Sequence, residues 1–290
     1  MIRKLFLSAI TALIASTAAA NDECPPLNAS PETRAVICRM LAAHGDMARW
    51  RAAPSVEFHH VMRIPDSPEV WNSWETTEQG RRRTYQEWPL DKARIAYDGA
   101  RTWSANWQKG NPPSFMVNTV YYFLNLPWIV FDPGVRLGAP GAGTLPGDPV
   151  SYTTVKMTVD PGVGATSNDY YTIYIDPKTG LMKATEYIVT HAALLDVFGL
   201  PPDRTFLGPF IHVYDSYMKV DGLAIPSSYR TFNPEGKVYG LHEVKEFSLS
   251  KAFDEKRLEM PADGKVDTSD PKRRKVQSSG GPSSSKGGKE

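Results

Sequence analysis

The arrangement of apolar and polar positions changes early in the chain. Ser30-Pro31-Glu32-Thr33 opens a helical pattern that continues to about Ala43, because Ser30 suits the capping position and Pro31 the first turn. From Val56 to Ile64 apolar and polar side chains alternate, as they do on a half-buried β-strand. The first part of the chain therefore predicts a helix that leads into a sheet.

Strand-like runs rich in Tyr, Val, Thr and Ile make up most of the remaining chain. Turn pairs such as Asp98-Gly99 and Asp221-Gly222 separate them at hairpin distances. We expect about eleven strands, at residues 56–64, 70–77, 81–88, 93–97, 101–107, 151–159, 169–175, 181–189, 210–220, 223–232 and 238–248. Such a meander predicts a mainly β (α+β) fold, an incomplete antiparallel β-barrel closed by helices.

Residues 114–131 interrupt the strands with apolar side chains on every side of a helix. A helix of this kind must be covered on most of its faces. Pro127 is expected to kink or end it, and with Asn118 and Asn125 it makes the segment a poor membrane span. Two interpretations stay open: the helix plugs the mouth of the curled sheet, or it simply fills the core.

The N-terminus has the layout of an export signal. Met1–Lys4 is basic, Leu5–Thr17 is apolar, and Ala18-Ala19-Ala20 offers small side chains for cleavage before Asn21. Residues 1–20 therefore predict a secretory signal peptide, with an N-terminal core helix as the alternative, and the periplasm as the location.

Export also gives meaning to the two cysteines of the chain, Cys24 and Cys38. An oxidising compartment favours pairing them, which would close a loop of ~15 residues and stabilise the fold by about 3 kcal/mol. The alternative is a pair of unbonded buried thiols, because sequence alone gives no disulfide geometry.

Charge is distributed unevenly along the chain. Between residues 21 and 264, which we expect to form a single domain, acidic side chains outnumber basic ones, so nothing predicts nucleic-acid binding. Residues 265–290 are basic, contain no aromatic residue and are dominated by Ser, Gly and Lys, which predicts a disordered tail. This tail either contacts anionic lipid head groups or cell-wall polymer, or is inert.

Signatures of catalysis are missing from the sequence. There is no Gly-x-Ser-x-Gly elbow and no His-Glu-x-x-His, and the glycine-rich residues 138–144 lack the lysine of a phosphate loop, which favours a flexible loop. His59 and His60 are adjacent on a strand, so they face opposite sides and cannot chelate one ion. Nothing in the spacing requires the other strand histidines to meet: His191, His212 and His242. We expect no catalytic residue, no metal site, no cofactor and no enzyme activity.

The order of several short motifs points to a family. From about Ala42 to Val266 the chain carries, in sequence, an entry helix that runs into Trp50, Ala96-Tyr97-Asp98-Gly99-Ala100-Arg101-Thr102-Trp103, Tyr174–Leu181, Val220–Pro226 and Phe253 followed by Met260-Pro261. The second of these is similar to an Asp-Gly-x-x-x-Trp hairpin. Together, behind an export signal, they resemble the LolA/LolB-like superfamily of periplasmic outer-membrane lipoprotein carriers.

The resemblance implies an incomplete barrel of about eleven antiparallel strands, closed by helices, with an apolar cavity for acyl chains and no cofactor or covalent chemistry. The chain's many aromatic residues fit such a cavity or an ordinary packed core. We expect the following residues to line the cavity: Val56, Phe58, Met62, Trp103, Phe115, Tyr122, Phe123 and Trp128. The candidates for the family's helix-holding arginine are Arg63 and the run Arg81-Arg82-Arg83, while the cysteine pair and the basic tail are additions.

The expected partner is the acyl chain of a lipid or lipoprotein, bound by a monomer that contacts a membrane transiently at most. The alternative is an envelope interaction or sensor module in which the sheet packs solidly and binds another envelope protein through an exposed edge. In neither case do we expect a nucleic acid.

Overall fold

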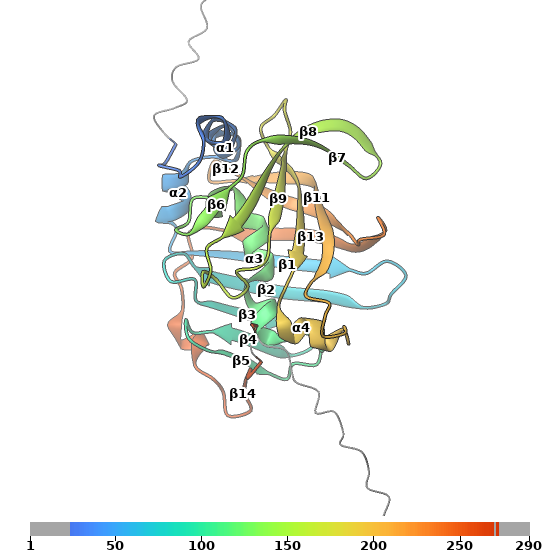
Figure 1. Cartoon of the computed structure of the whole chain (residues 1–290). Coiled ribbons are helices and arrows are strands. Elements are labelled where there is room, and N and C mark those ends of the chain that lie inside the picture. Colours follow the sequence, from blue (N-terminus) through green and yellow to red (C-terminus); the bar gives the residue numbers. More distant parts are fainter. Residues whose placement is uncertain (1–23, 270, 273–290) are drawn as a thin grey trace, which may run out of the picture.

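One antiparallel sheet dominates the computed structural model, which describes residues 24–269 and 271–272 (Figure 1). Its strands are β1 (Ser55–Arg63), β2 (Val70–Glu78), β3 (Thr84–Trp88), β4 (Ala93–Tyr97), β5 (Thr102–Ala105), β6 (Val135–Leu137), β7 (Gly141–Leu145), β8 (Asp148–Val159), β9 (Tyr171–Ile175), β10 (Met182–Val189), β11 (Leu207–Val220), β12 (Leu223–Phe232), β13 (Val238–Ser248) and β14 (Lys265–Val266). The order across the sheet is β14-β5-β4-β3-β2-β1-β13-β12-β11-β10-β9-β8-β6, and β7 pairs with β8 beside this path. Pairing of β1 with β13 joins an early half of the sheet to a late half.

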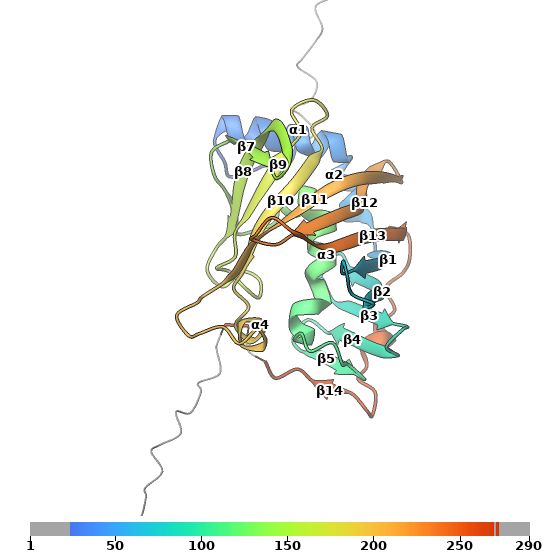
Figure 2. The same cartoon turned by 90° about the vertical axis from the view of Figure 1, so that its right-hand side faces the viewer.

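The helices cover the inside and the ends of the curled sheet. In Figure 2, α1 (Pro31–His44) and α2 (Met47–Ala52) lie at one end, α3 (Pro113–Ile129) runs along the concave side, and α4 (Ala192–Val197) lies towards the other end. None of these helices, in the part of the chain described, is both long and apolar enough to cross a membrane. Within residues 24–269 the outermost strands β14 and β6 do not pair with each other, so the barrel is incomplete, as predicted.

All of the expected strands are present, and the mainly β fold class with an incomplete antiparallel barrel is confirmed. Three further strands, β6, β7 and β14, were not expected. β7 lies in the glycine-rich segment that we expected to be a flexible loop. Its Gly141 pairs with Thr154 of β8, and a Cβ on Gly143 would lie 2.9 Å from the ring of Tyr174. The glycines therefore allow a close approach of two chain segments, which is a common reason for glycine in a strand.

The fold also continues beyond residue 264, where we placed the start of the tail. Lys265 and Val266 of β14 pair with Ser104 and Trp103 of β5, and the amide of Ala192 donates a hydrogen bond to the carbonyl of Pro271 at 2.9 Å. Residues 265–269 and 271–272 thus belong to the folded part. The rest of the expected tail and the expected signal peptide, residues 1–20, lie outside the described residues.

The predicted disulfide is present at the N-terminal end of this fold. Cys24 and Cys38 are bonded with their Cα atoms 5.5 Å apart, which ties the N-terminal arm to α1. α1 also begins as predicted, because the hydroxyl of Ser30 accepts a hydrogen bond from the amide of Thr33 at 3.2 Å. It ends at Gly45, whose φ is +104° and where an added Cβ would lie 2.7 Å from the carbonyl oxygen of Gly222. Only glycine fits this contact between α1 and the β11–β12 turn.

Candidate functional site: the concave face under α3

The two halves of α3 are buried to different extents. Every residue from 123 to 130 is buried, whereas five of the eight residues from 113 to 120 are only half-buried. The helix continues through Pro127, which has no amide hydrogen to give to the carbonyl of Phe123. The hydroxyl of Tyr214 on β11 donates to that carbonyl instead, at 3.1 Å. A proline is therefore accommodated inside the helix because the sheet supplies the missing donor.

Aromatic packing and buried amide contacts hold the second half of α3. The ring of Trp128 stacks on that of Trp50 from α2, with centroids 5.8 Å apart. The indole nitrogen of Trp50 donates to the side-chain carbonyl of Asn125 at 2.8 Å, and the side-chain amide nitrogen of Asn125 donates to the backbone carbonyl of Tyr121. This half of the helix is part of the main hydrophobic core that it forms with α1, α2 and the sheet.

Among the candidate helix-holding arginines, Arg82 is the one that contacts the end of α3. Its guanidinium pairs with Asp132 at 2.5 Å and lies 5.9 Å from the centroid of the Tyr121 ring. Arg83 pairs with Glu78 and Glu255, and Arg63 with Glu243. Arg82 is therefore the residue of the set that can hold this helix against the sheet.

The first half of α3 is held by side chains from distant parts of the chain. Pro112 at the N-cap gives no side-chain hydrogen bond, and the carboxylate of Asp267 takes that role by accepting from the amide of Ser114 at 2.8 Å. The hydroxyls of Ser114 and Ser269 lie 3.1 Å apart. In addition, Thr84 of β3 donates to the side-chain carbonyl of Asn118 at 2.6 Å. Asp267 and Ser269, which follow β14, therefore fasten the start of α3 by hydrogen bonds, and we call these two residues the latch.

Three buried histidines meet on the concave face, and we call them the histidine cluster: His60 of β1, His212 of β11 and His242 of β13. Nε2 of His60 lies 3.0 Å from Nδ1 of His242, and Nε2 of His242 lies 2.8 Å from the hydroxyl of Thr231. Nε2 of His212 lies 2.6 Å from the hydroxyl of Tyr187. Strand pairing across the molecule, and not sequence spacing, brings the three rings together.

Ring stacking connects the histidine cluster to α3. The ring of Tyr229 stacks on His242 with centroids 4.1 Å apart, and His212 stacks on Phe123 of α3 at 4.2 Å. His59, as predicted, points away from this face and stacks on Trp74. The cluster is therefore a polar region inside an aromatic interior, directly against the middle of the helix.

A buried carboxyl group lies beside the cluster and connects the sheet to the first half of α3. The hydroxyl of Ser73 donates to Oε1 of Glu75 at 2.8 Å, and the amide of Gln86 donates to Oε2 at 2.9 Å. The same amide nitrogen lies 3.2 and 2.9 Å from the backbone carbonyl oxygens of Met116 and Val117. Glu75 thus reaches α3 through Gln86.

Burial keeps these groups uncharged at neutral pH. It raises the pKa of Glu75 to about 8 and lowers the pKa of both His60 and His212 to about 3, because the interior disfavours the charged forms. The pKa of His242 is also lowered, well below its ordinary value. Nδ1 of His60 lies 4.0 Å from Oε1 of Glu75, too far for a hydrogen bond. Among the described residues this Nδ1 and that of His212 have no hydrogen-bond partner.

Metal binding finds no support at this cluster. In the described part of the chain no group of three or more His, Cys, Asp or Glu side chains is arranged to hold a metal ion. His191, which we expected on a strand, instead caps α4, where its Nδ1 accepts from the amide of Leu194 at 3.4 Å. What the cluster offers chemically is hydrogen bonding without charge.

The residues expected to line a cavity are placed in several parts of the structure. The largest group belongs to the main core: Val56, Phe58, Tyr122 and Trp128. Phe115 and Phe123 pack with Tyr187 and Leu194 of the late half of the sheet and α4, and Met62 lies near His242. Trp103 is not with them, because its side chain is on the outer face of β5.

The space beneath the second half of α3 is filled. Val56, Phe58, Leu124 and Trp128 have no accessible surface at all, and a side chain beside a void large enough for water would keep some. The side chains of α3 therefore occupy the room that the sequence analysis assigned to a ligand.

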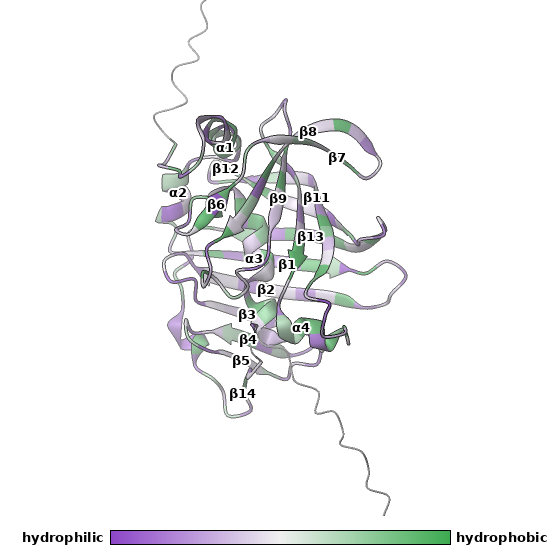
Figure 3. Cartoon of the chain, in the orientation of Figure 1, coloured by the Kyte–Doolittle hydropathy of each residue, from purple (hydrophilic) through white to green (hydrophobic). Residues whose placement is uncertain are grey.

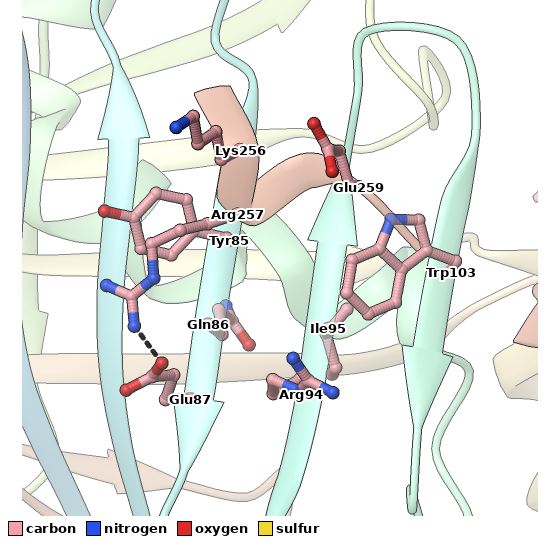
Figure 4. Close-up of a pocket in the computed structure, with 9 residues that line it drawn as sticks. All are labelled: Tyr85, Gln86, Glu87, Arg94, Ile95, Trp103, Lys256, Arg257 and Glu259. Carbon is pink, nitrogen blue, oxygen red and sulfur yellow. Dashed lines mark hydrogen bonds and ion pairs between the residues drawn. The ribbon is translucent and has the colours of Figure 1, made fainter. Parts of the chain in front are cut away.

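Trp103 borders a different pocket, on the outer face of the sheet (Figure 4). There Phe253 and the short helix η1 (Glu255–Leu258) cover β3, β4 and β5, and the indole nitrogen of Trp103 donates to the carbonyl of Leu258 at 2.8 Å. The pocket has a volume of about 190 Å³, and Arg257 pairs with Glu87 across it. Ligand pockets usually measure roughly 300–1,000 Å³, so this one is small, and its charged wall does not suit an acyl chain.

A wider hollow of about 520 Å³ lies on the surface beside α2 and the N-terminal arm, lined by Pro25, Asp46, Met47, Ala48, Arg51 and Ala52. Neither this hollow nor the outer pocket lies between α3 and the sheet. A ligand bound between α3 and the sheet would therefore require α3 to move.

An open antiparallel sheet with an apolar helix along its concave face defines the class of protein, and solved structures share this fold. A DUF1329 family protein from Desulfovibrio piger matches with a TM-score of 0.50 and 12% identity, over 79% of this chain and 97% of that one. The LolA superfamily protein NE2245 from Nitrosomonas europaea has a TM-score of 0.49 and 9% identity, over 79% and 97%. A putative outer membrane lipoprotein-sorting protein domain from Vibrio parahaemolyticus has a TM-score of 0.45 and 7% identity, over 77% and 94%.

No protein-family model matches the chain, and no curated protein matches it either. At such low identities the likeness to the solved structures is one of fold alone. The predicted architecture, an incomplete antiparallel barrel covered by helices, is the one observed, and the DUF1329 family protein shares this fold.

Proposed function

We propose that the protein is an exported, periplasmic carrier that binds the acyl chains of a lipid or lipoprotein on its concave face, in place of the first half of α3. The observation that carries this proposal is α3 itself. A helix with apolar side chains on every side lies along the concave face of an open sheet, and its first half is only half-buried. An acyl chain presents the same kind of surface and gains about 25 cal/mol for each Å² removed from water.

The contacts of the first half of α3 support an opening movement. Its polar contacts with the rest of the molecule are hydrogen bonds with Asp267, which accepts from the helix, with Thr84 and Gln86, which donate to it, and with the hydroxyl of Ser269. Water can replace these hydrogen bonds when the helix moves. The second half cannot move as easily, because Trp128 would lose its stacking on Trp50 and its complete burial. We therefore place the ligand on the part of the concave face that the first half of α3 now covers.

The histidine cluster offers polar partners to the ligand. An ester, amide or carboxyl end of an acylated ligand needs hydrogen bonds when it leaves water. Nδ1 of His60 and of His212 are buried nitrogens with no partner among the described residues, and either can donate or accept according to its tautomer. We propose that they receive the polar end of the ligand, while the apolar side chains around α3 receive its chain. No cofactor and no covalent step is involved.

The proposed location rests on the sequence and on the disulfide. Residues 1–20 have the layout of a secretory signal, and disulfides such as Cys24–Cys38 persist in oxidising compartments.

A reversible lock on α3 tests the function. The hydroxyls of Ser114 and Ser269 lie 3.1 Å apart, so a Ser114→Cys/Ser269→Cys variant should form a disulfide that fastens the start of α3. We expect the wild-type protein, purified without detergent, to contain lipid by mass spectrometry and to bind a dansyl-labelled long-chain fatty acid. The oxidised variant should bind this probe at least about tenfold more weakly, since opening is blocked, and reduction should restore binding.

The controls are the single Ser269→Cys variant and the wild type with and without reductant, because reductant also acts on Cys24–Cys38. A wild-type protein that contains no lipid and binds no probe would rule out the carrier. Equal binding by the locked and unlocked forms would keep the carrier but remove α3 from its mechanism.

The second candidate is an envelope interaction or sensor module with no ligand. The observation that favours it is the filled interior, in which Val56, Phe58 and Trp128 leave no room. The same experiment separates the two functions, because a module of this kind should bind no probe in either form.

A further inference from the structure

We infer that the histidine cluster makes the concave face selective for acylated ligands with an uncharged polar end, an ester or an amide. Ligands with an anionic end, such as the carboxylate of a free fatty acid, are disfavoured. This selectivity rests on the proposed function, because it concerns the ligand of the same face. It assigns to His60 and His212 a role in specificity, which depends on the groups that surround these two side chains.

The hydrogen bonds within the cluster allow both unpartnered nitrogens to act as donors. The hydroxyl of Tyr187 can donate to Nε2 of His212 across 2.6 Å, which leaves the hydrogen of this ring on Nδ1. Thr231 can likewise donate to Nε2 of His242, and Nδ1 of His242 to Nε2 of His60, at 2.8 and 3.0 Å. Nδ1 of His60 then carries a hydrogen too. Two buried donors without a partner suit the carbonyl oxygen of an ester or an amide.

In the part of the chain that the structure describes, no lysine or arginine is buried on the concave face. α3 contains no charged residue, and Figure 3 shows this helix mostly in green and pale colours. Among the described residues Arg83 is the only lysine or arginine that is buried. Arg83 pairs with Glu78 and Glu255 and lies over the ring of Phe253, which packs on the outer face of the sheet.

The strands that carry the cluster, and the strands paired with them, contribute five lysines and arginines: Arg63, Lys183, Lys219, Arg230 and Lys245. Arg63 and Lys245 both pair with Glu243, and Arg230 pairs with Asp215. Lys183 donates to the backbone carbonyl of Tyr214, and Lys219 is exposed. None of these positive charges therefore accompanies a ligand at the cluster.

The other described titratable groups around the cluster are an acid and phenols, none of which becomes positive. They come from β2 and from β9 to β13, and they are Glu75, Tyr171, Tyr187, Tyr214, Tyr229 and Tyr239. Burial raises the pKa of each, that of Glu75 to about 8, and lowers the pKa of His60 and His212 to about 3. Between pH 5.5 and 7 the site therefore stays mostly uncharged, and an anion that left water here would have no positive partner.

Two probes that differ only at the polar end test the selectivity: a dansyl-labelled long-chain fatty acid and its methyl ester. The ordinary pKa of a carboxyl group is about 4.3, so at pH 7 about one molecule of the acid in 500 is uncharged. We expect the wild type to bind the ester about 100-fold more tightly than the acid at pH 7. Affinity for the acid should rise about 30-fold from pH 7 to 5.5, as its neutral form becomes more abundant, while affinity for the ester stays the same.

Variants of His212 separate a role in specificity from a role in the fold. His212→Leu and His212→Asn both lose the contact with Tyr187, but Asn keeps a polar atom at the same number of bonds from Cβ as Nδ1. His212→Leu should bind the ester about tenfold more weakly, and His212→Asn should restore most of this loss. His59→Leu is the matched control, because His59 stacks on Trp74 away from the cluster and should leave the binding of both probes unchanged. Circular dichroism and thermal unfolding check that the variants fold.

The wild-type comparison decides the selectivity even if a variant does not fold. Equal affinities for ester and acid at pH 7, or an affinity for the acid that does not change with pH, would overturn the selectivity and keep the carrier, since a positive charge would then have to meet the carboxylate. Equal losses in His212→Leu and His212→Asn would overturn the role of His212 as the donor. Binding of neither probe would rule out the carrier function, and the selectivity with it.

Discussion

The first and second halves of α3 belong to the same helix but depend on different parts of the molecule. From 123 to 130 every residue is buried, and the contacts are mainly aromatic rings and uncharged amides of the core. From 113 to 120 most residues are half-buried, and the polar contacts include two ionisable groups, Asp267 directly and Glu75 through Gln86. One end of the helix is therefore completely enclosed in the core, while the other end is less buried.

The two sets of contacts differ in free energy as well as in kind. Burial of large side chains in a packed interior contributes several kcal/mol each, whereas a hydrogen bond contributes about 1 kcal/mol net. Segments with few buried contacts open without global unfolding. The first half of α3 should therefore open at a much lower free energy than the second.

Removal of a large side chain from each half gives the largest expected contrast. Trp128→Ala removes a completely buried ring and its stacking on Trp50, and we expect it to lower the free energy of unfolding by about 3–5 kcal/mol. Phe115→Ala removes a half-buried ring from the first half and should cost about 1–2 kcal/mol. Urea unfolding followed by circular dichroism measures both values. Equal losses would contradict the difference between the halves.

The pH dependence of stability tests the buried carboxyl group that reaches the first half. Because the pKa of Glu75 is raised to about 8 in the folded protein, the folded state holds a proton that the unfolded state releases above its ordinary pKa near 4.5. Stability should therefore fall as pH rises between these values, by about 1.4 kcal/mol per unit, and by about 2 kcal/mol between pH 6.5 and 8. Glu75→Gln keeps a neutral side chain and should remove this fall.

The histidines give the opposite slope on the acid side. Burial lowers the pKa of His60 and His212 to about 3, so below their ordinary value of 6.5 the unfolded state binds protons that the folded state does not. Stability should drop as pH falls from 6.5, and the drop should be steeper in Glu75→Gln, because that variant lacks the gain that protonated Glu75 gives the wild type in this range. Urea unfolding at pH 5, 6.5 and 8 separates the two slopes, and an unchanged loss between pH 6.5 and 8 in Glu75→Gln would show that another group causes it.

The sequence was sufficient for features that depend on local patterns. Alternation from Val56 to Ile64 predicted β1, Ser30 and Pro31 predicted the start of α1, and export predicted the Cys24–Cys38 bond. The apolar run at 114–131 predicted α3 to within a few residues, although it could not show that Tyr214 would supply the donor that lets the helix pass Pro127. The order of the short motifs along the chain predicted the overall fold.

Local sequence patterns could not predict the contacts between strands that are far apart in the chain. His60 and His242 are 182 positions apart, and they meet because β1 pairs with β13 in a register that the sequence does not reveal. The sequence did contain a sign that Glu75 is unusual. Glu75 and Ser73 are two positions apart on β2 and share its buried face, and an acid on a buried face needs an explanation. Trp103 was assigned to the wrong face of the sheet, because Phe253 and η1 also cover the outer face and bury apolar side chains there.

The smallest expected effect concerns the latch on the start of α3. Asp267→Ala removes the carboxylate that accepts from the amide of Ser114, and we expect a loss of about 1 kcal/mol, typical of a helix cap. The change should be local, so the amides at the start of α3 should exchange with solvent about fivefold faster while those of residues 123–130 stay protected. Asp254→Ala is the matched control, because Asp254 caps η1 in the same way without touching α3. Hydrogen exchange followed by mass spectrometry measures both, and faster exchange over the whole of α3 would mean that the helix opens as one unit rather than by its first half.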